Sequence, residues 1–346
     1  MNVWKIVIHP NPDIDAIAAA WALRKFGGEK FLGINSAEIA FHNGSLKKEP
    51  GMIFVDCGGQ DFDHHPQEKF PEDCSLSLVI KHLGIEGDPC LEKISQMVLA
   101  SDLKGGDQPF SLAQTVKDLN LTFFDEPGKV IAWGINALEA KYNSQLEFLF
   151  AEHGSQFEKI EVELPGNIVR CIYAAETNSR SFPMWARYKG ASLVVQRNPE
   201  TGLVQIFSNK SILGMNFVIE DILRAVRVEE VWTKKSSLFC DWERFASEGS
   251  IPEVPEWYYH KVGQMVLNGS LTNPQVPPTK IPWSKIKGLV KVALSPELPN
   301  PGCRSRGDIC FPRCEYRDYG FWRCRKLRYE LSQKKPKSSS PVPPAG

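Results

Sequence analysis

The chain has 346 residues, enough for two domains that each bury a sizeable core. Hydrophobic residues make up 42% and charged residues 24%, the balance of an ordinary soluble globular protein. No run reaches the ~18 apolar residues that a membrane helix requires. The N-terminal residues 1–6 lack the pattern of a signal peptide, so we expect a cytoplasmic protein with no membrane partner.

The net charge is zero overall but unevenly distributed. From Cys303 to Lys337 there are eleven basic and four acidic residues, a local charge of +7, so the rest of the chain carries −7. An acidic body suits cation binding, and a basic tail can attract phosphates. Nine cysteines in a chain expected in the cytoplasm argue against disulfides.

The first residues predict the opening of a parallel α/β sheet. Residues 3–9 are typical of a buried strand, and a proline-containing loop leads to an alanine-rich helix over about 13–26. Ligands of such sheets gather at the carboxyl ends of the strands, where His9, Asp13 and Asp15 are expected. Asp13 can instead be a helix N-cap and Asp15 a favourable charge in the first turn. That alternative leaves His9 unexplained.

A second polar cluster follows the apolar run Met52–Val55, which predicts a short buried strand. Asp56 stands at its carboxyl end, two glycines allow a tight turn, and Asp63, His64 and His65 come soon after. Two carboxylates about 4 Å apart repel by roughly 4 kcal/mol at an effective dielectric near 20. The crowding therefore indicates a divalent metal site.

Three helical patterns come next, at about 75–83, 89–103 and 112–120. Asp102 lies at the end of the second, before a flexible Gly-Gly, and can reach inward from there. Asp107 is a weaker candidate, and a solvated aspartate at a helix end is an equally good interpretation of Asp102. A long helix is expected from about 128 to 153.

From Lys159 the pattern changes to a mixed α+β domain with strands near 159–163, 167–174, 192–197 and 203–208. A helix near 217–226 completes it. Arg187, Arg197 and Lys210 stand near the ends of elements, where they can meet an anionic substrate. The alternative is that these charges are simply solvated.

Four cysteines near the C-terminus, Cys303, Cys310, Cys314 and Cys324, offer thiolates for Zn²⁺ or an iron–sulfur cluster. Arginines and aromatic residues interleaved with them suit nucleic acid, with guanidinium groups on phosphates and rings on bases. The alternative is a basic tail with incidental cysteines.

Together, His9-x3-Asp13-x-Asp15, Asp56, Asp63-His64-His65 and Asp102 resemble the four motifs of the DHH phosphoesterase superfamily. That superfamily includes RecJ-type exonucleases, oligoribonucleases and manganese-dependent inorganic pyrophosphatases. The compact Val-Asp-Cys-Gly-Gly followed by Asp-His-His is most similar to its melanocyte-proliferating-gene branch, which includes exonucleases. The resemblance covers roughly residues 1–125.

The resemblance implies a role for each residue. His9 and Asp13 would hold one metal ion, Asp15, His64 and Asp102 a second, and Asp56 would bridge the two. His65 would face the substrate phosphate, and Asp63 would orient its neighbours. The oxygen and nitrogen ligands suit Mn²⁺, with Mg²⁺ or Co²⁺ as substitutes.

The chain departs from the family in its second half. The Gly-Gly-Gly-His motif that binds substrate in many members is absent, and the nearest candidate, residues 209–214, has no histidine. The four-cysteine module is not a feature of the superfamily either. Substrate identity is thus left open by the resemblance.

The expected fold is α/β, a doubly wound, mostly parallel sheet followed by a smaller α+β domain and a cysteine-rich module. The predicted parts are a DHH-type metal-binding phosphoesterase domain (1–125), a connecting helix (126–158), an α+β substrate domain (159–270), a proline-rich linker (271–300), a four-cysteine basic module (301–332) and a disordered tail (333–346).

The expected function is that of a hydrolase, a metal-dependent phosphoesterase that cleaves phosphodiester bonds of short single-stranded RNA or DNA by two-metal activation of water. The alternatives are a small-molecule phosphohydrolase acting on pyrophosphate, polyphosphate or a nucleotide, and a non-catalytic nucleic-acid-binding protein. The sequence does not determine the oligomeric state.

Overall fold

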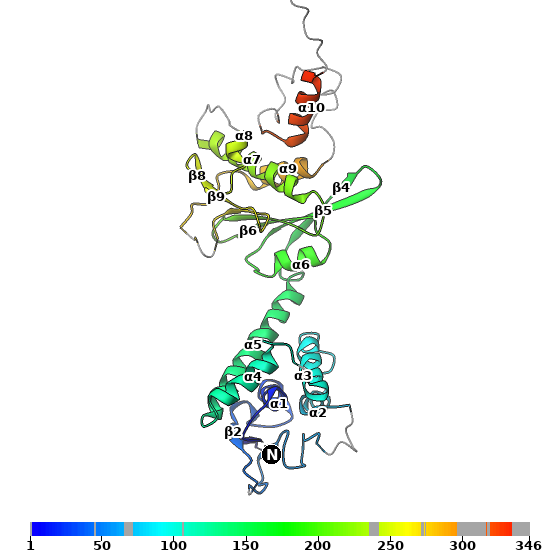
Figure 1. Cartoon of the computed structure of the whole chain (residues 1–346), viewed down its shortest axis with the longest axis vertical. Coiled ribbons are helices and arrows are strands. Elements are labelled where there is room, and N and C mark those ends of the chain that lie inside the picture. The colour runs from blue at the N-terminus through cyan, green and yellow to red at the C-terminus, as the bar shows by residue number, and fades with distance from the viewer. Residues whose placement is uncertain are drawn as a thin grey trace, which may run out of the picture. The chain divides into compact units, whose positions relative to one another are not determined.

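The chain folds into two compact units, Met1–Leu149 and Phe150–Gly346 (Figure 1). The computed structural model describes residues 2–44, 46–65, 72–105, 107–234, 242–270, 273, 275–295, 316 and 319–333. Within these residues, no helix has the length and apolar character needed to cross a membrane.

The first unit contains a three-stranded parallel sheet in the order β2-β1-β3. Its strands are β1 (Lys5–Ile8), β2 (Glu38–Phe41) and β3 (Met52–Phe54). The central strand is the apolar run expected at the N-terminus, and Ile6 pairs with Ile39 on one side and Ile53 on the other. Since all three strands are parallel, their carboxyl ends lie at one edge of the sheet.

The helices of this unit surround α1. They are α1 (Ile14–Phe26), α2 (Ser75–Leu83), α3 (Glu92–Lys104), α4 (Leu112–Thr122) and α5 (Pro127–Phe150), with the short 3-10 helices η1 (Gly27–Glu29) and η2 (Ile34–Ser36). Ten consecutive residues of α1, from Ile14 to Leu23, are buried. Its alanines allow close packing, and a Cβ at Gly134 of α5 would lie 2.9 Å from Ile17. The long helix therefore belongs to the first unit's core.

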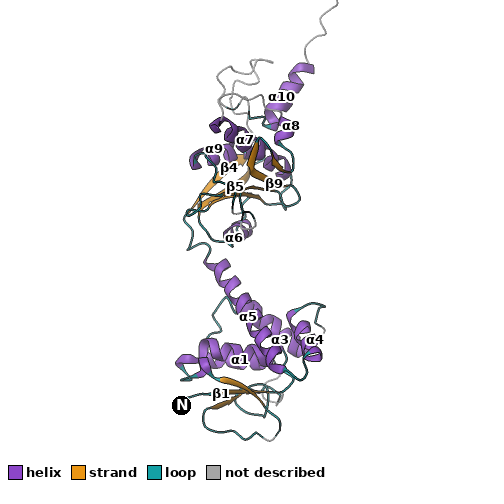
Figure 2. Cartoon of the chain, turned by 90° about the vertical axis from the view of Figure 1, so that its left-hand side faces the viewer, coloured by secondary structure: helices purple, strands orange, loops and turns teal. Residues whose placement is uncertain are grey.

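The doubly wound arrangement is not confirmed in the described residues. Figure 2 shows α1 lying on one face of the three-stranded sheet. Ile6, Ile8 and Ile53 belong to the large core that also contains the buried residues of α1. The other face carries a small separate cluster built on Val7, Met52, Phe54 and Cys57, to which no helix of the described chain contributes. The structure supports the coarser description, a mixed α/β protein.

The second unit contains a seven-stranded, mostly antiparallel sheet in the order β4-β5-β6-β7-β10-β9-β8. Its strands are β4 (Phe157–Leu164), β5 (Ile168–Glu176), β6 (Leu193–Arg197), β7 (Val204–Ser208), β8 (Gly249–Ile251), β9 (Val254–His260) and β10 (Met265–Asn268). Only the pairing of β5 with β6 is parallel. Strands β9 and β10 pair antiparallel as a hairpin.

The helices of this unit are α6 (Phe182–Tyr188), α7 (Met215–Lys234), α8 (Trp242–Phe245), α9 (Trp283–Leu294) and α10 (Trp322–Gln333). Helix α9 lies in the region expected to be a linker, and buries Ile286, Leu289 and Val290 in the unit's core. Tyr319 and Phe321, two of the aromatic residues expected to contact nucleic acid, are buried in the same core. The many prolines of residues 271–300 favoured the interpretation as a linker, although the apolar residues of α9 recur at helical spacing.

Arg227 of α7 is fully buried and bonds to backbone carbonyls. Its Nη1 donates to the carbonyls of Phe245 at 3.0 Å and Ser247 at 2.9 Å, and its Nη2 to those of Trp257 at 2.9 Å and Gly249. Burial lowers the pKa of its guanidinium to about 10. The side chain thus ties α7 to the segment that leads into β8 and β9.

Candidate metal centre

The candidate site lies at the carboxyl edge of the parallel sheet, as the sequence pattern predicts. His9 follows β1, and Asp13 is the N-cap of α1, where its Oδ1 accepts from the backbone N–H groups of Asp15 at 2.9 Å and Ala16 at 3.0 Å. The alternative interpretation of Asp13 as a cap is therefore correct, and it leaves the Oδ2 atom available as a ligand. Asp56 follows β3.

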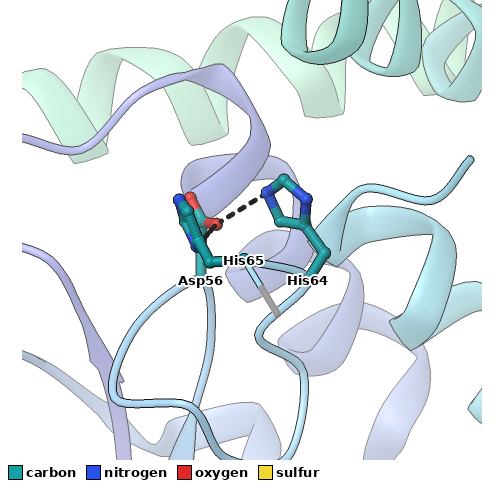
Figure 3. Close-up of side chains that lie close together, drawn as sticks. All are labelled: Asp56, His64 and His65. Carbon is teal, nitrogen blue, oxygen red and sulfur yellow. Dashed lines mark ion pairs between the residues drawn. The ribbon is translucent and has the colours of Figure 1, made fainter. Parts of the chain in front are cut away.

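The backbone at Asp56 is left-handed, with φ of 55°. Gly58 and Gly59 follow with φ of 75° and 64°, values that glycine adopts without steric cost. Aspartate and asparagine tolerate this conformation better than most residues. The turn brings the segment 63–65 back beside Asp56 (Figure 3).

Asp56 lies at the centre of the cluster and is only 3% exposed. Its Oδ2 is 3.3 Å from Nε2 of His9, and its Oδ1 is 3.3 Å from Nε2 of His64. One group of possible ligands, with atoms within 4.8 Å of one another, consists of His9, Asp13 and Asp56. Asp56 therefore stands between this group and His64, the arrangement that a bridging carboxylate needs.

A second group consists of Asp15, His64 and Asp102. Nε2 of His64 is 3.6 Å from Oδ2 of Asp102 and 3.8 Å from Oδ2 of Asp15. Nε2 of His64 and Oδ2 of Asp102 are buried and make no hydrogen bond among the described residues. Buried polar atoms are seldom left this way. The donor set therefore fits a divalent cation with mixed oxygen and nitrogen ligands.

Helix α2 holds the carboxylates of this group. The backbone N–H groups of Ser75 and Leu76 donate to the two oxygens of Asp15 at 2.7 and 2.9 Å. The Ser75 hydroxyl donates to Oδ1 of Asp56 at 3.1 Å. The sequence pattern did not single out Ser75, because its role depends on where the start of α2 docks.

Asp63 orients its neighbours rather than joining either group. Its Oδ1 accepts from the backbone N–H of His65 at 3.0 Å and lies 2.7 Å from Nδ1 of the same residue, and its Oδ2 accepts from the Gly59 N–H at 2.6 Å. The His65 side chain is 64% exposed and also lies 3.5 Å from Asp56. His65 is thus held with its ring at the open side of the cluster.

The charges of the cluster shift the pKa values of its members. Burial favours the neutral form of Asp56, yet the neighbouring imidazoles of His64 and His9 keep the pKa of this carboxyl below its usual value. The carboxylate of Asp56 beside His64 raises the pKa of this imidazole to about 9 against the effect of burial. Burial and the charge of Asp56 raise the pKa of Asp15 to about 7, and burial raises that of Asp102. These buried carboxylates therefore favour added positive charge, from protons or from cations.

The other predicted residues lie outside this cluster. Asp107 accepts from Ser101 at 3.0 Å and pairs with Lys117 at 2.8 Å. In the second unit, Arg197 pairs with Glu176 at 3.3 Å, and Lys210 donates to the Val262 carbonyl at 3.3 Å.

Arg187 lines a cavity of about 570 Å³ in the second unit, together with Asn198, Gln205 and Phe207. Its Nε donates to the Pro183 carbonyl at 3.0 Å. The structure thus does not gather Arg187, Arg197 and Lys210 into one anion site.

The four-cysteine module is only partly within the described residues. Cys303, Cys310 and Cys314 lie outside them. Cys324 is in α10 and packs, half-buried, against the core of the second unit. The metal at these cysteines stays a prediction.

Comparison with models of known protein families gave no match, and no curated protein matched the sequence. The resemblance to DHH phosphoesterases therefore rests on the spacing of the motifs in the sequence alone.

Proposed function

We propose that the protein is a divalent-metal-dependent phosphoesterase whose centre is the cluster around Asp56. The observation that carries this proposal is the pair of ligand groups on either side of one buried carboxylate, His9 with Asp13 and Asp15 with His64 and Asp102. Each expected ligand position is filled by a residue able to bind a metal ion. A purely structural site or a degenerate one would not require six such residues.

The residues would hold two cations, Mn²⁺ or in its place Mg²⁺ or Co²⁺, which supply activation of water and neutralisation of charge on the phosphorus centre. The chain's own groups prepare the site. Asp15 and Asp56 are fixed by hydrogen bonds from α2, so little reorganisation accompanies binding.

His65 is the residue best placed to meet a substrate phosphate. Its ring is exposed, and the bond between Nδ1 and Asp63 leaves Nε2 to face outward. A proton on Nδ1 directed to the carboxylate fixes the tautomer, as in other oriented histidines. His65 would hold one phosphate oxygen, and Asp63 would act as its positioning residue.

The favoured substrate is a short single-stranded RNA or DNA. The basic C-terminal region supports this through its charge, whereas the burial of Tyr319 and Phe321 removes two of the rings available for stacking. Contact with a phosphate backbone predicts that binding weakens steeply with salt. Hydrolysis of pyrophosphate with little salt dependence would favour a small-molecule phosphohydrolase instead.

The test is turnover by the purified full chain with Mn²⁺ against labelled RNA and DNA oligomers, pyrophosphate and a generic phosphodiester. Asp56→Asn suits the left-handed backbone at this position, and His64→Ala removes the second ligand group's imidazole. Turnover by both variants should fall at least about 100-fold. Removal of a residue that only hydrogen-bonds to a metal ligand already lowers metal affinity or activity by about 10- to 100-fold, and these variants change a ligand itself.

Glu92→Gln is the matched control, because Glu92 lies in the first turn of α3, at the opposite end of that helix from Asp102, and bonds to the exposed Gln96. It should keep wild-type turnover, and all variants should keep the wild-type circular dichroism. Full activity in both Asp56→Asn and His64→Ala would refute the proposal.

A further inference from the structure

A cavity of about 750 Å³ opens directly beside the first ligand group. Two of its wall residues, His9 and Asp13, are also members of that group. The remaining residues that line the cavity are Asn11, Lys117, Asn120, Leu121 and Phe124. The cavity lies within the first unit and is of the size that accommodates a small organic ligand.

Helix α4 and the turn after it form the far wall. Lys117, Asn120 and Leu121 recur at helical spacing and so share one face of α4, and Phe124 follows in the turn after the helix. Asn120 is buried and donates to the Pro12 carbonyl at 2.8 Å, which fixes this face against the loop that carries Asp13. The distance between the wall and the ligand group is therefore set by a direct bond.

The wall is apolar where it faces solvent. Leu121 is 81% exposed and Phe124 is 75% exposed. The polar side chains of this wall already have partners within the protein, because Lys117 pairs with Asp107 and Asn120 donates to the Pro12 carbonyl. This lining offers a flat apolar surface and little to hold a further anion. An inorganic phosphate or pyrophosphate would make no use of it.

We propose that the cavity binds the nucleobase attached to the phosphate at the metal centre, with the base on Phe124 and Leu121. Stacking on an aromatic ring tolerates any base, which suits an enzyme without sequence preference. Asn11 also lines the cavity and is exposed, and its amide would meet the edge of the base. This inference rests on the proposed function and narrows the substrate to a nucleotide or oligonucleotide.

Binding of adenosine monophosphate and of inorganic phosphate to the full chain with Mn²⁺, measured by calorimetry, tests this inference without turnover. Phe124→Ala should weaken binding of the nucleotide between about 5-fold and 150-fold, the range for loss of one base–aromatic stack, and leave phosphate binding unchanged. Phe124→Trp should restore nucleotide binding. Leu32→Ala, at a 70% exposed leucine that does not line the cavity, should change neither ligand.

A second experiment measures KM for two dinucleotides, one with the base on its terminal nucleoside and one that is abasic at that position. Phe124→Ala should raise KM for the dinucleotide with the base and not for the abasic one.

Three results would overturn the inference: equal weakening of both ligands in Phe124→Ala, no weakening of either, or wild-type affinity no tighter for the nucleotide than for phosphate. Failure of the proposed function is a separate outcome, since the wild type would then bind neither ligand in a manner that requires Mn²⁺ and Asp56.

Discussion

The Ser75 hydroxyl donates to Oδ1 of Asp56 at 3.1 Å, while the backbone N–H of the same residue donates to Asp15 at 2.7 Å. The first residue of α2 thus fixes two carboxylates from different segments of the chain. Because Asp56 lies between the two ligand groups, its orientation affects both.

Ser75→Ala should lower Mn²⁺ affinity by about 10- to 100-fold, the usual effect of removing a partner of a metal ligand. Isothermal titration calorimetry of the metal-free protein would measure this. Ser77→Ala is the control on the same helix, because Ser77 bonds to Cys74 instead. An affinity equal to that of the wild type in Ser75→Ala would show that the hydroxyl does not position Asp56.

The metal-free protein should lose stability as the pH rises from 6.5 to about 9. The carboxylate of Asp56 raises the pKa of His64 in the folded protein from 6.5 to about 9. A group with a raised folded pKa stabilises the fold fully below its unfolded pKa, and this contribution disappears as the pH passes the folded value. Urea unfolding in the presence of a chelator, at half-unit steps of pH, would measure the slope.

His64→Gln should flatten this slope, whereas His153→Gln, at an exposed histidine on the surface, should retain it. Mn²⁺ should also reduce the loss of stability with rising pH in the wild type. The metal binds the neutral imidazole, so its affinity increases as His64 loses its proton. A slope that is the same in His64→Gln as in the wild type would contradict the assignment.

Gly134→Ala should destabilise the first unit by about 1–3 kcal/mol, because the new Cβ would lie 2.9 Å from Cγ2 of Ile17 in a packed helix contact. Gly128→Ala in the same helix meets no atom within 4 Å and should stabilise by about 0.4–1 kcal/mol. Thermal unfolding of the two variants should therefore shift in opposite directions. A shift of equal sign would show that α1 and α5 can separate at this point.

Arg227→Lys should destabilise the second unit by about 2–4 kcal/mol, since an ammonium cannot serve all the carbonyls that the guanidinium bonds and leaves some unsatisfied. Arg244→Lys, at an exposed pair with Glu253, should change the free energy of unfolding by less than about 1 kcal/mol. Chemical denaturation followed by circular dichroism would compare the two. Equal small effects would mean that water replaces the lost bonds.

Much of the site can be predicted from the sequence, because the ends of the short apolar strands can be located in it. His9 and Asp56 come directly after short apolar runs, and parallel strands bring such positions to one edge. Asp102 was harder, because a carboxylate at a helix end is equally consistent with solvent exposure. Ser75 and Phe124 were not found, since their roles depend on how α2 and α4 dock.

The fold was predicted unevenly for similar reasons. The strands predicted near 192–197 and 203–208 are confirmed as β6 and β7, which pair antiparallel across a short segment that contains Asn198 and Gly202. Helix α9 was missed, although Ile286, Leu289, Val290 and Ala293 recur at helical spacing. The faces of the first sheet could not be assigned, because a three-residue strand such as Met52–Phe54 is apolar throughout.

All six proposed metal ligands come from residues 9 to 102, and so from the first unit alone. Under the proposed function, a substitution after residue 149 leaves every proposed metal ligand in place. The second half of the chain can therefore diverge in sequence without loss of the metal centre.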